Sequence, residues 1–177
     1  MQFAKFLELL FFPSNILLIL FLILAYDSFA MMSIIDMFVY SLAIVGLPLG
    51  FFIMNKKSRR KNRAALISLS IVITVFTILS FLFPSLRSLR FLYLSTYSFL
   101  ILGLLLFLIR FKWKISLHVS FYTACITVLT IFNINFLFFY VFVPLIAWCR
   151  IKLKVHTFYQ TLAGFLVGLT VSFVFLF

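Results

Sequence analysis

The sequence predicts an all-α fold, a polytopic transmembrane helical bundle of six to seven spans. Hydrophobic residues make up 66% of the 177 residues, 27 residues are phenylalanine, and the mean hydropathy is +1.30. So little polar surface could not cover a soluble domain. Uncharged runs of about the 20 residues needed to cross a hydrocarbon core recur along the whole chain. These runs do not alternate apolar and polar residues, as the strands of a membrane barrel would.

The apolar runs give the order of the spans. The first begins after Glu8 and Pro13, which interrupt a signal-peptide pattern, so we expect a retained span. The fifth and sixth share only residues 115–149 and must form a tight hairpin of short helices that turns at Asn133 and Asn135. All connections are short, which predicts a single integral membrane domain over residues 1–177. The expected spans lie at about 14–30, 33–54, 64–83, 91–109, 115–132, 135–149 and 157–177.

The basic residues predict the orientation of this bundle. Counting the spans puts the N-terminus and the loops at 55–63, 110–114 and 150–156 on one side of the membrane. Of the 15 Lys and Arg residues, only Arg87 and Arg90 fall on the other side. The positive-inside rule makes the basic side cytoplasmic. We therefore expect an integral protein of a cytoplasmic or inner membrane, with these loops in the cytoplasm.

The formal net charge of +12 has several explanations. Nucleic-acid binding is a poor one, because the cations are scattered through tight membrane loops and form no domain. Basic residues near span ends set topology and attract anionic lipid head groups. We interpret eight of them in this way: Lys57, Arg59, Arg60, Lys61, Lys112, Lys114, Lys152 and Lys154.

Three of the basic loops also carry a pattern of polar residues. The first contains Lys56 and, after six intervening residues, Arg63. The second contains Ser116 and His118, where a span begins. The third contains Arg150 and His156, separated by five residues, and Gln160 follows one helical turn later. The two histidines of the chain thus lie at span boundaries on the side of the cations.

The pattern resembles the membrane-bound type 2 phosphatidic acid phosphatase superfamily, which is related to the vanadium haloperoxidases. That family shows the motifs KxxxxxxRP, PSGH and SRxxxxxHxxxD. Here Ala64 follows Arg63 in place of proline, the second motif reads ISLH over residues 115–118, and the third begins with Cys149. The similarity runs from about residue 50 to about residue 170. No single motif is specific. The order of the three motifs and the spacings within them nevertheless match the family, and two expected spans lie between the second motif and the third.

The resemblance implies phosphomonoester or pyrophosphate hydrolysis through a phosphohistidine. His156 would be the nucleophile and His118 the general acid. Lys56, Arg63, Ser116 and Arg150 would hold the phosphate oxygens, since phosphoryl transfer needs mainly positioning and stabilisation of spread negative charge. The substrate would be a membrane lipid phosphate or an isoprenoid pyrophosphate.

We expect no cofactor and no metal at this site. The chain has only three carboxylates, Glu8, Asp27 and Asp36, and span counting separates the two aspartates from the basic side. A two-metal site would therefore lack ligands.

Four positions depart from the family pattern. Gln160 replaces the aspartate that orients the nucleophilic histidine, and can accept a hydrogen bond from Nδ1 without supplying a charge. Ala64 replaces proline, Leu117 replaces glycine and Cys149 replaces serine. A second hypothesis follows, a catalytically degenerate subunit that keeps the fold and binds lipid or assembles with membrane proteins not identified by the sequence. A small transporter is a third, disfavoured by the lack of charges within the spans.

One face of the last expected span is small and polar. His156, Gln160, Gly164, Gly168 and Ser172 recur every four residues and therefore lie on one side of a helix. Gly164 and Gly168 form a GxxxG motif, which lets another helix approach closely. We expect this face to pack within the bundle rather than to form a dimer.

Overall fold

The computed structural model describes residues 90–176, together with the single positions Ile19 and Ile23. The expected spans at 33–54 and 64–83, and nearly all of that at 14–30, lie outside the described residues. The predicted site residues Lys56 and Arg63 also lie outside them.

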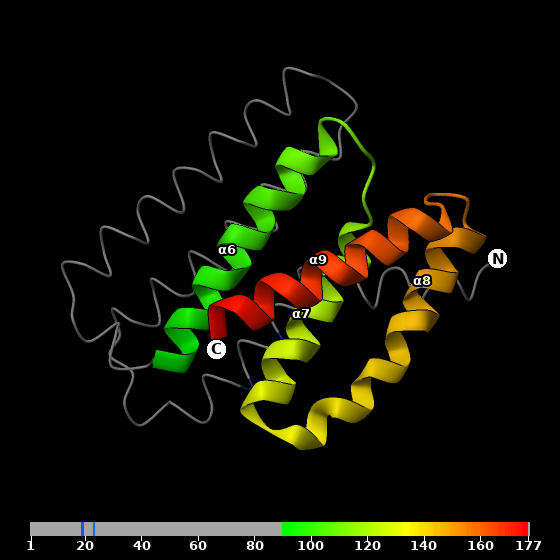
Figure 1. The fold of residues 1–177 in the computed structure, drawn as a ribbon. Helices are drawn as coiled ribbons and strands as arrows, with labels where there is room; N and C mark the ends of the chain where they lie inside the picture. The colour runs from blue at the N-terminus through cyan, green and yellow to red at the C-terminus, as the bar shows by residue number, and fades with distance from the viewer. Residues whose placement is uncertain (1–18, 20–22, 24–89, 177) are drawn as a thin grey trace.

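The described part of the chain is helical and contains no strand (Figure 1). Its four expected spans are confirmed as helical segments, with boundaries within a few residues of those read from the sequence. They are α6 (Arg90–Arg110), α7 (Leu117–Phe132), the 3-10 helix η2 (Ile134–Val141) continued by α8 (Phe142–Lys152), and α9 (Phe158–Leu176).

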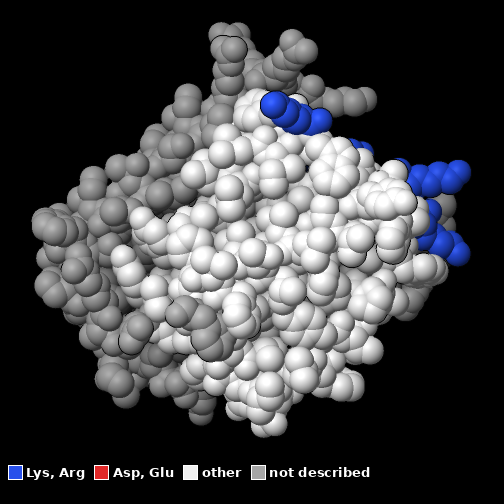
Figure 2. Space-filling view, in the orientation of Figure 1, with Lys and Arg blue, Asp and Glu red and all other residues white. Residues whose placement is uncertain are grey.

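Three of these segments are long and apolar enough to cross a membrane: Tyr93–Arg110, Ile134–Lys152 and Phe158–Leu176. Figure 2 shows the same property on the surface, where the Lys and Arg side chains lie toward one edge of an otherwise uncharged face. Large apolar side chains remain exposed on η2 and α9, among them Phe138 at 71% and Val174 at 66%. These features identify an integral membrane protein.

The shorter helix α7 is the centre of the described bundle. Its 16 residues reach only about 24 Å at about 1.5 Å per residue. Every residue from Leu117 to Leu129 is nonetheless buried, because α6, η2, α8 and α9 all pack against this helix. Phe121, Ala124 and Val128 have no exposed surface. The helix is therefore covered by protein over most of its length.

The hairpin that follows α7 turns at Asn133, as the sequence predicts. The Asn133 N–H donates to the Leu129 carbonyl (2.7 Å), and its side-chain oxygen accepts from the Asn135 N–H (3.0 Å). An asparagine oxygen that bonds the backbone two residues later replaces helical hydrogen bonds and favours a turn. Asn133 thus ends α7 through its backbone and begins η2 through its side chain.

The 3-10 helix in the returning arm was not predicted. Pro144 has no N–H to donate to the Tyr140 carbonyl, and its ring disfavours an α-helix through the preceding turn. The chain therefore enters α8 through η2. A 3-10 segment rises about 2.0 Å per residue against about 1.5 Å in an α-helix, so η2 and α8 together reach about 32 Å.

Hydrogen bonds from polar side chains hold η2 against α7. The hydroxyl groups of Thr127 and Tyr140 lie 2.7 Å apart, and the Tyr122 hydroxyl donates to the Phe139 carbonyl (3.1 Å). Both bonds are partly buried among apolar side chains, where a hydrogen bond is stronger than in water. They fix the arms of the hairpin side by side.

The packing of α9 on α7 confirms that the GxxxG face is used within the chain. A Cβ atom on Gly164 would lie 2.8 Å from the Ser116 carbonyl oxygen, and one on Gly168 would overlap the Ser120 carbonyl. Only glycine lets the two helices approach this closely. The Ser116 N–H also donates to the Gln160 carbonyl (3.2 Å), which joins the starts of both helices.

Candidate functional site

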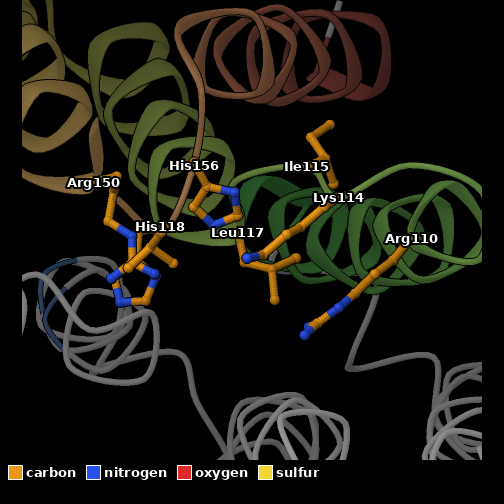
Figure 3. A pocket seen from close by; sticks show the side chains of 8 residues that line it. Arg110, Lys114, Ile115, Leu117, His118, Arg150 and His156 are labelled. Atoms are coloured by element: carbon orange, nitrogen blue, oxygen red, sulfur yellow. The ribbon is translucent and has the colours of Figure 1, made fainter. Parts of the chain in front are cut away.

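A pocket of about 70 Å³ lies where three connecting segments meet (Figure 3). The end of α6 and the loop after it contribute two cations, the start of α7 contributes a histidine, and the segment from α8 to α9 contributes a cation and the second histidine. The volume has room for several water-sized groups, and hence for a tetrahedral anion. The lining residues are Arg110, Lys114, Ile115, Leu117, His118, Arg150, Val155 and His156.

The loop between Arg150 and His156 closes on itself. The Lys154 N–H donates to the Ile151 carbonyl (2.9 Å) and the Val155 N–H donates to the Arg150 carbonyl (3.1 Å). Lys154 has a φ of 54°, in the left-handed region. This combination is the Schellman motif that ends many helices, with a lysine where glycine is usual. The His156 N–H also lies 3.3 Å from the Arg150 carbonyl, so the five-residue spacing holds the histidine beside the end of α8.

A second local motif begins α9 immediately after His156. The Thr157 N–H donates to Gln160 Oε1 (3.0 Å), and the Gln160 N–H lies 3.4 Å from Thr157 Oγ1. This reciprocal pair is a capping box, in which a threonine and a glutamine three residues later satisfy each other's backbone donors. Gln160 is thereby fixed in one orientation, with its carbonyl oxygen toward Thr157.

The same glutamine oxygen orients His156. Its Nδ1 atom lies 3.3 Å from Gln160 Oε1, the contact expected from the four-residue spacing. Because the Thr157 N–H identifies Oε1 as an acceptor, Nδ1 must be the donor in this contact. In the neutral ring the proton therefore lies on Nδ1, and Nε2 keeps its lone pair.

The charge state of His156 follows from its surroundings. Burial and the positive charge of Arg150 lower its pKa to about 4, the charge of Lys114 acts in the same direction, and the hydrogen bonds to Gln160 and to the Lys114 backbone oppose them. His156 is thus neutral near pH 7. A neutral imidazole can attack an electrophile such as phosphorus through its unprotonated nitrogen.

His118 and Arg150 form the buried end of the pocket. Their side chains are only 7% and 6% exposed. Water is largely excluded around a guanidinium group buried to this extent, so a charged hydrogen bond made there is stronger than in water. Figure 3 shows both side chains on one side of His156.

The described residues offer no grouping of at least three His, Cys, Asp or Glu that could hold a metal ion. Residues 90–176 also include no Asp or Glu. The donors on the described pocket wall are nitrogen atoms of cations and imidazoles, which suit an anion.

The structure brings together three of the residues expected from the sequence, His118, Arg150 and His156, with Gln160 supporting the last. Ser116 does not line the pocket. Its side chain is fully buried, and its hydroxyl has no hydrogen-bond partner among the described residues. Its main chain instead contacts α9.

Two lining cations were not among the expected site residues. Lys114 and Arg110 carry charges at the ends of expected spans, a pattern that topology alone explains. The spacing of four residues between Lys114 and His118 is a signal that could have pointed to the lysine.

Comparisons of the chain with protein-family models, with curated proteins and with solved structures give no match. The chemistry of the pocket therefore rests on its own geometry and on the motifs in the sequence.

Proposed function

We propose that the protein is an integral membrane phosphatase that removes a phosphate group from a lipid phosphate or an isoprenoid pyrophosphate. The observation that carries the proposal is the meeting of His118, Arg150 and His156 at one pocket, with Nδ1 of His156 bonded to Gln160. The proposal includes membership of the type 2 phosphatidic acid phosphatase superfamily. It also includes a single domain over residues 1–177 with six to seven spans, and a site on the cytoplasmic side.

In the proposed reaction the Nε2 lone pair of His156 attacks phosphorus. A P–N bond forms, the P–O bond to the leaving group breaks, and His118 gives its proton to the leaving oxygen. Water then attacks the phosphohistidine while His118 takes a proton from it, which releases phosphate and restores both histidines. Arg150, together with Lys56 and Arg63 from outside the described residues, would bind the remaining phosphate oxygens.

No metal ion has a part in this scheme. The positive charges of Arg110, Lys114 and Arg150 on the pocket wall can balance the charge of a phosphate group and of the transition state. In this proposal the three cations have the electrostatic role that metal ions have in metal-dependent phosphatases.

A second candidate function is a non-catalytic subunit with an intact anion site. Leu117 lines the pocket where the family motif has glycine, and the Ser116 hydroxyl lies outside the lining. Gln160 provides no negative charge to stabilise a phosphorylated imidazole. These features favour binding of a phosphate group without turnover.

Phosphate release by the purified protein distinguishes the two. The assay uses detergent without added metal, with phosphatidic acid, phosphatidylglycerol phosphate or an isoprenoid pyrophosphate as substrate. For the enzyme we expect release that is lost in His156→Ala and His118→Ala, while Lys112→Ala, a change in an exposed residue off the pocket, keeps it. Thermal unfolding of His156→Ala and Lys112→Ala should be similar to that of wild type, and the same measurement checks that His118→Ala, which truncates a buried side chain, is still folded at the assay temperature. Equal release by wild type and His156→Ala would refute the phosphohistidine, and no release on any substrate would favour the subunit.

A further inference from the structure

Lys114 differs from the other lysines near the pocket. Lys112, Lys114 and Lys154 lie in short loops at the basic end and Lys152 ends α8; of these four, only Lys114 is among the described lining residues. It is the central residue of a turn in which the Ile115 N–H donates to the Trp113 carbonyl (3.0 Å), and α7 begins shortly after it, at Leu117. The side chains of Phe111 and Trp113 in the same loop are exposed, at 57% and 44%.

The side chain of Lys114 extends toward His156. Figure 3 shows its amine beneath the imidazole and beside Leu117, between the His118–Arg150 side of the pocket and Arg110. The charge of Lys114 is near enough to act on the imidazole of His156. A phosphate group placed for attack by His156 would therefore lie within reach of this amine.

Burial gives Lys114 and Arg150 different positions in the pocket. Arg150 is 6% exposed, whereas Lys114 is exposed. One cation is thus at the closed end and the other at the open end. An anion that enters from solvent or from the head-group region meets Lys114 before Arg150.

We propose that Lys114 is a specificity-determining residue whose ammonium group binds a terminal phosphate and selects it over a phosphodiester. Lys114 has this role only if the pocket binds a phosphoryl group, as proposed above. A terminal phosphate above about pH 6 carries close to two negative charges, and a diester carries one. Of the three lining cations, Arg150 and Lys114 are the two whose charges act on His156, so they can each neutralise one charge of a terminal phosphate placed for attack by this histidine, while Arg110 lies farther from it (Figure 3). The diester has no second charge for Lys114, so its binding gains less from the lysine.

Binding of two soluble probes tests this selection. Inorganic phosphate stands for the terminal group and dimethyl phosphate for the diester, and both are titrated at pH 8 by calorimetry into detergent-solubilised protein. For Lys114→Gln we expect a loss of about tenfold or more in phosphate affinity, the size of one charged hydrogen bond. The affinity for dimethyl phosphate should change far less. Lys114→Arg should restore most of the selection.

The matched control is Lys112→Gln, which removes the same charge from the same loop two residues earlier, off the pocket. It should leave both affinities unchanged. The imidazole of His156 supplies a second readout, taken together with the thermal unfolding of each variant, because exposure of the ring on unfolding would also raise its pKa. By NMR, Lys114→Gln should raise the pKa of His156 and Lys112→Gln should not.

The proposal would be overturned if Lys114→Gln lost equal affinity for phosphate and dimethyl phosphate. It would also be overturned if Lys114→Gln and Lys112→Gln changed the phosphate affinity equally. Absence of phosphate binding to wild type would overturn it together with the proposed function. Selective phosphate binding that depends on Lys114, without turnover of any lipid substrate, would support the role of Lys114 and reject the enzyme in favour of the non-catalytic subunit.

Discussion

His156 Nδ1 and Gln160 Oε1 lie 3.3 Å apart across the first turn of α9. The same oxygen accepts the Thr157 N–H at 3.0 Å, so one side chain begins the helix and sets the tautomer of the histidine. An aspartate at this position would add a negative charge to the arrangement. The glutamine therefore orients the histidine, as the aspartate would in the motif that the sequence resembles, and supplies no negative charge.

Gln160→Glu should increase turnover if the protein is a phosphatase. Glutamate has the same length and also completes a capping box, so the start of α9 should be retained. Its charge would stabilise the phosphorylated, positively charged ring. We expect turnover to rise at least about tenfold, and the pKa of His156 to rise from about 4 by about one to three pH units.

The measurements for this variant are phosphate release and an NMR titration of the His156 ring. Gln160→Met provides the contrast, because it keeps the side-chain length and removes the acceptor. It should lower both turnover and thermal stability. A pKa of His156 that is the same in Gln160→Glu and wild type would show that the two side chains do not interact.

The pH dependence of activity should reflect the low pKa of His156. The nucleophile must be neutral, and its pKa of about 4 keeps it neutral as the pH falls from 8 to 5. The acid limb of kcat/KM, which reports the free enzyme, should therefore have its midpoint near pH 4 rather than near 6.5. Measurement of kcat/KM from pH 3.5 to 8 checks this, and a midpoint near 6.5 would contradict it.

The same lowered pKa has a consequence for stability. In the unfolded chain the histidine binds a proton near its ordinary pKa of 6.5, so between about pH 4 and 6.5 the unfolded state holds more protons than the folded state. Folding stability contributed by this group then falls as the pH falls through that interval. The unfolding temperature should drop between pH 7 and pH 5 by more in wild type than in His156→Gln. Equal decreases of the unfolding temperature in the two proteins would contradict the lowered pKa of His156.

Lys154→Gly should stabilise the protein. Lys154 has a φ of 54°, which costs a residue with a side chain about 1–2 kcal/mol and costs glycine nothing comparable. We expect a gain of about 0.5–1 kcal/mol after the greater freedom of glycine in the unfolded chain is subtracted. Lys154→Ala removes the same charge without relieving the backbone, and should bring no gain. Equal unfolding free energies for Lys154→Gly and Lys154→Ala would contradict the prediction.

Gly168→Ala should destabilise the bundle. Its new methyl group would overlap the Ser120 carbonyl, so α9 and α7 must separate, at a cost of about 1–3 kcal/mol. Leu166→Ala, on a side chain 51% exposed, should change the unfolding free energy by no more than about 0.5 kcal/mol. Unfolding in detergent at several protein concentrations measures both. A concentration-dependent effect of Gly168→Ala would point to a contact between chains instead.

The fold of the described part follows largely from the positions of its charges and turns. Arg110 and Asn133 mark where apolar runs end, and the helices end or turn near them because burying these groups without partners is costly. The 3-10 geometry of η2 could not be obtained in this way. It depends on how Pro144 and the contact between Tyr140 and Thr127 fix the backbone together, and hydropathy does not contain that information.

The site was only partly predictable for a related reason. The spacing of His156 and Gln160 on one helix fixes their contact, so sequence sufficed there. Whether Lys114 or Ser116 faces the pocket depends on the rotation of α7, which the glycines of α9 determine through a contact between distant parts of the chain. A charge at a span end looks the same in the sequence whether it faces a pocket or the lipid head groups.

The glycine contacts between α7 and α9 also fix the separation of the two histidines. His118 lies in the first turn of α7 and His156 precedes α9, and the two helices touch at Ser120 and Gly168. A change in the way these helices cross would therefore move one imidazole relative to the other. The distance between the two histidines thus depends on glycines that do not line the pocket.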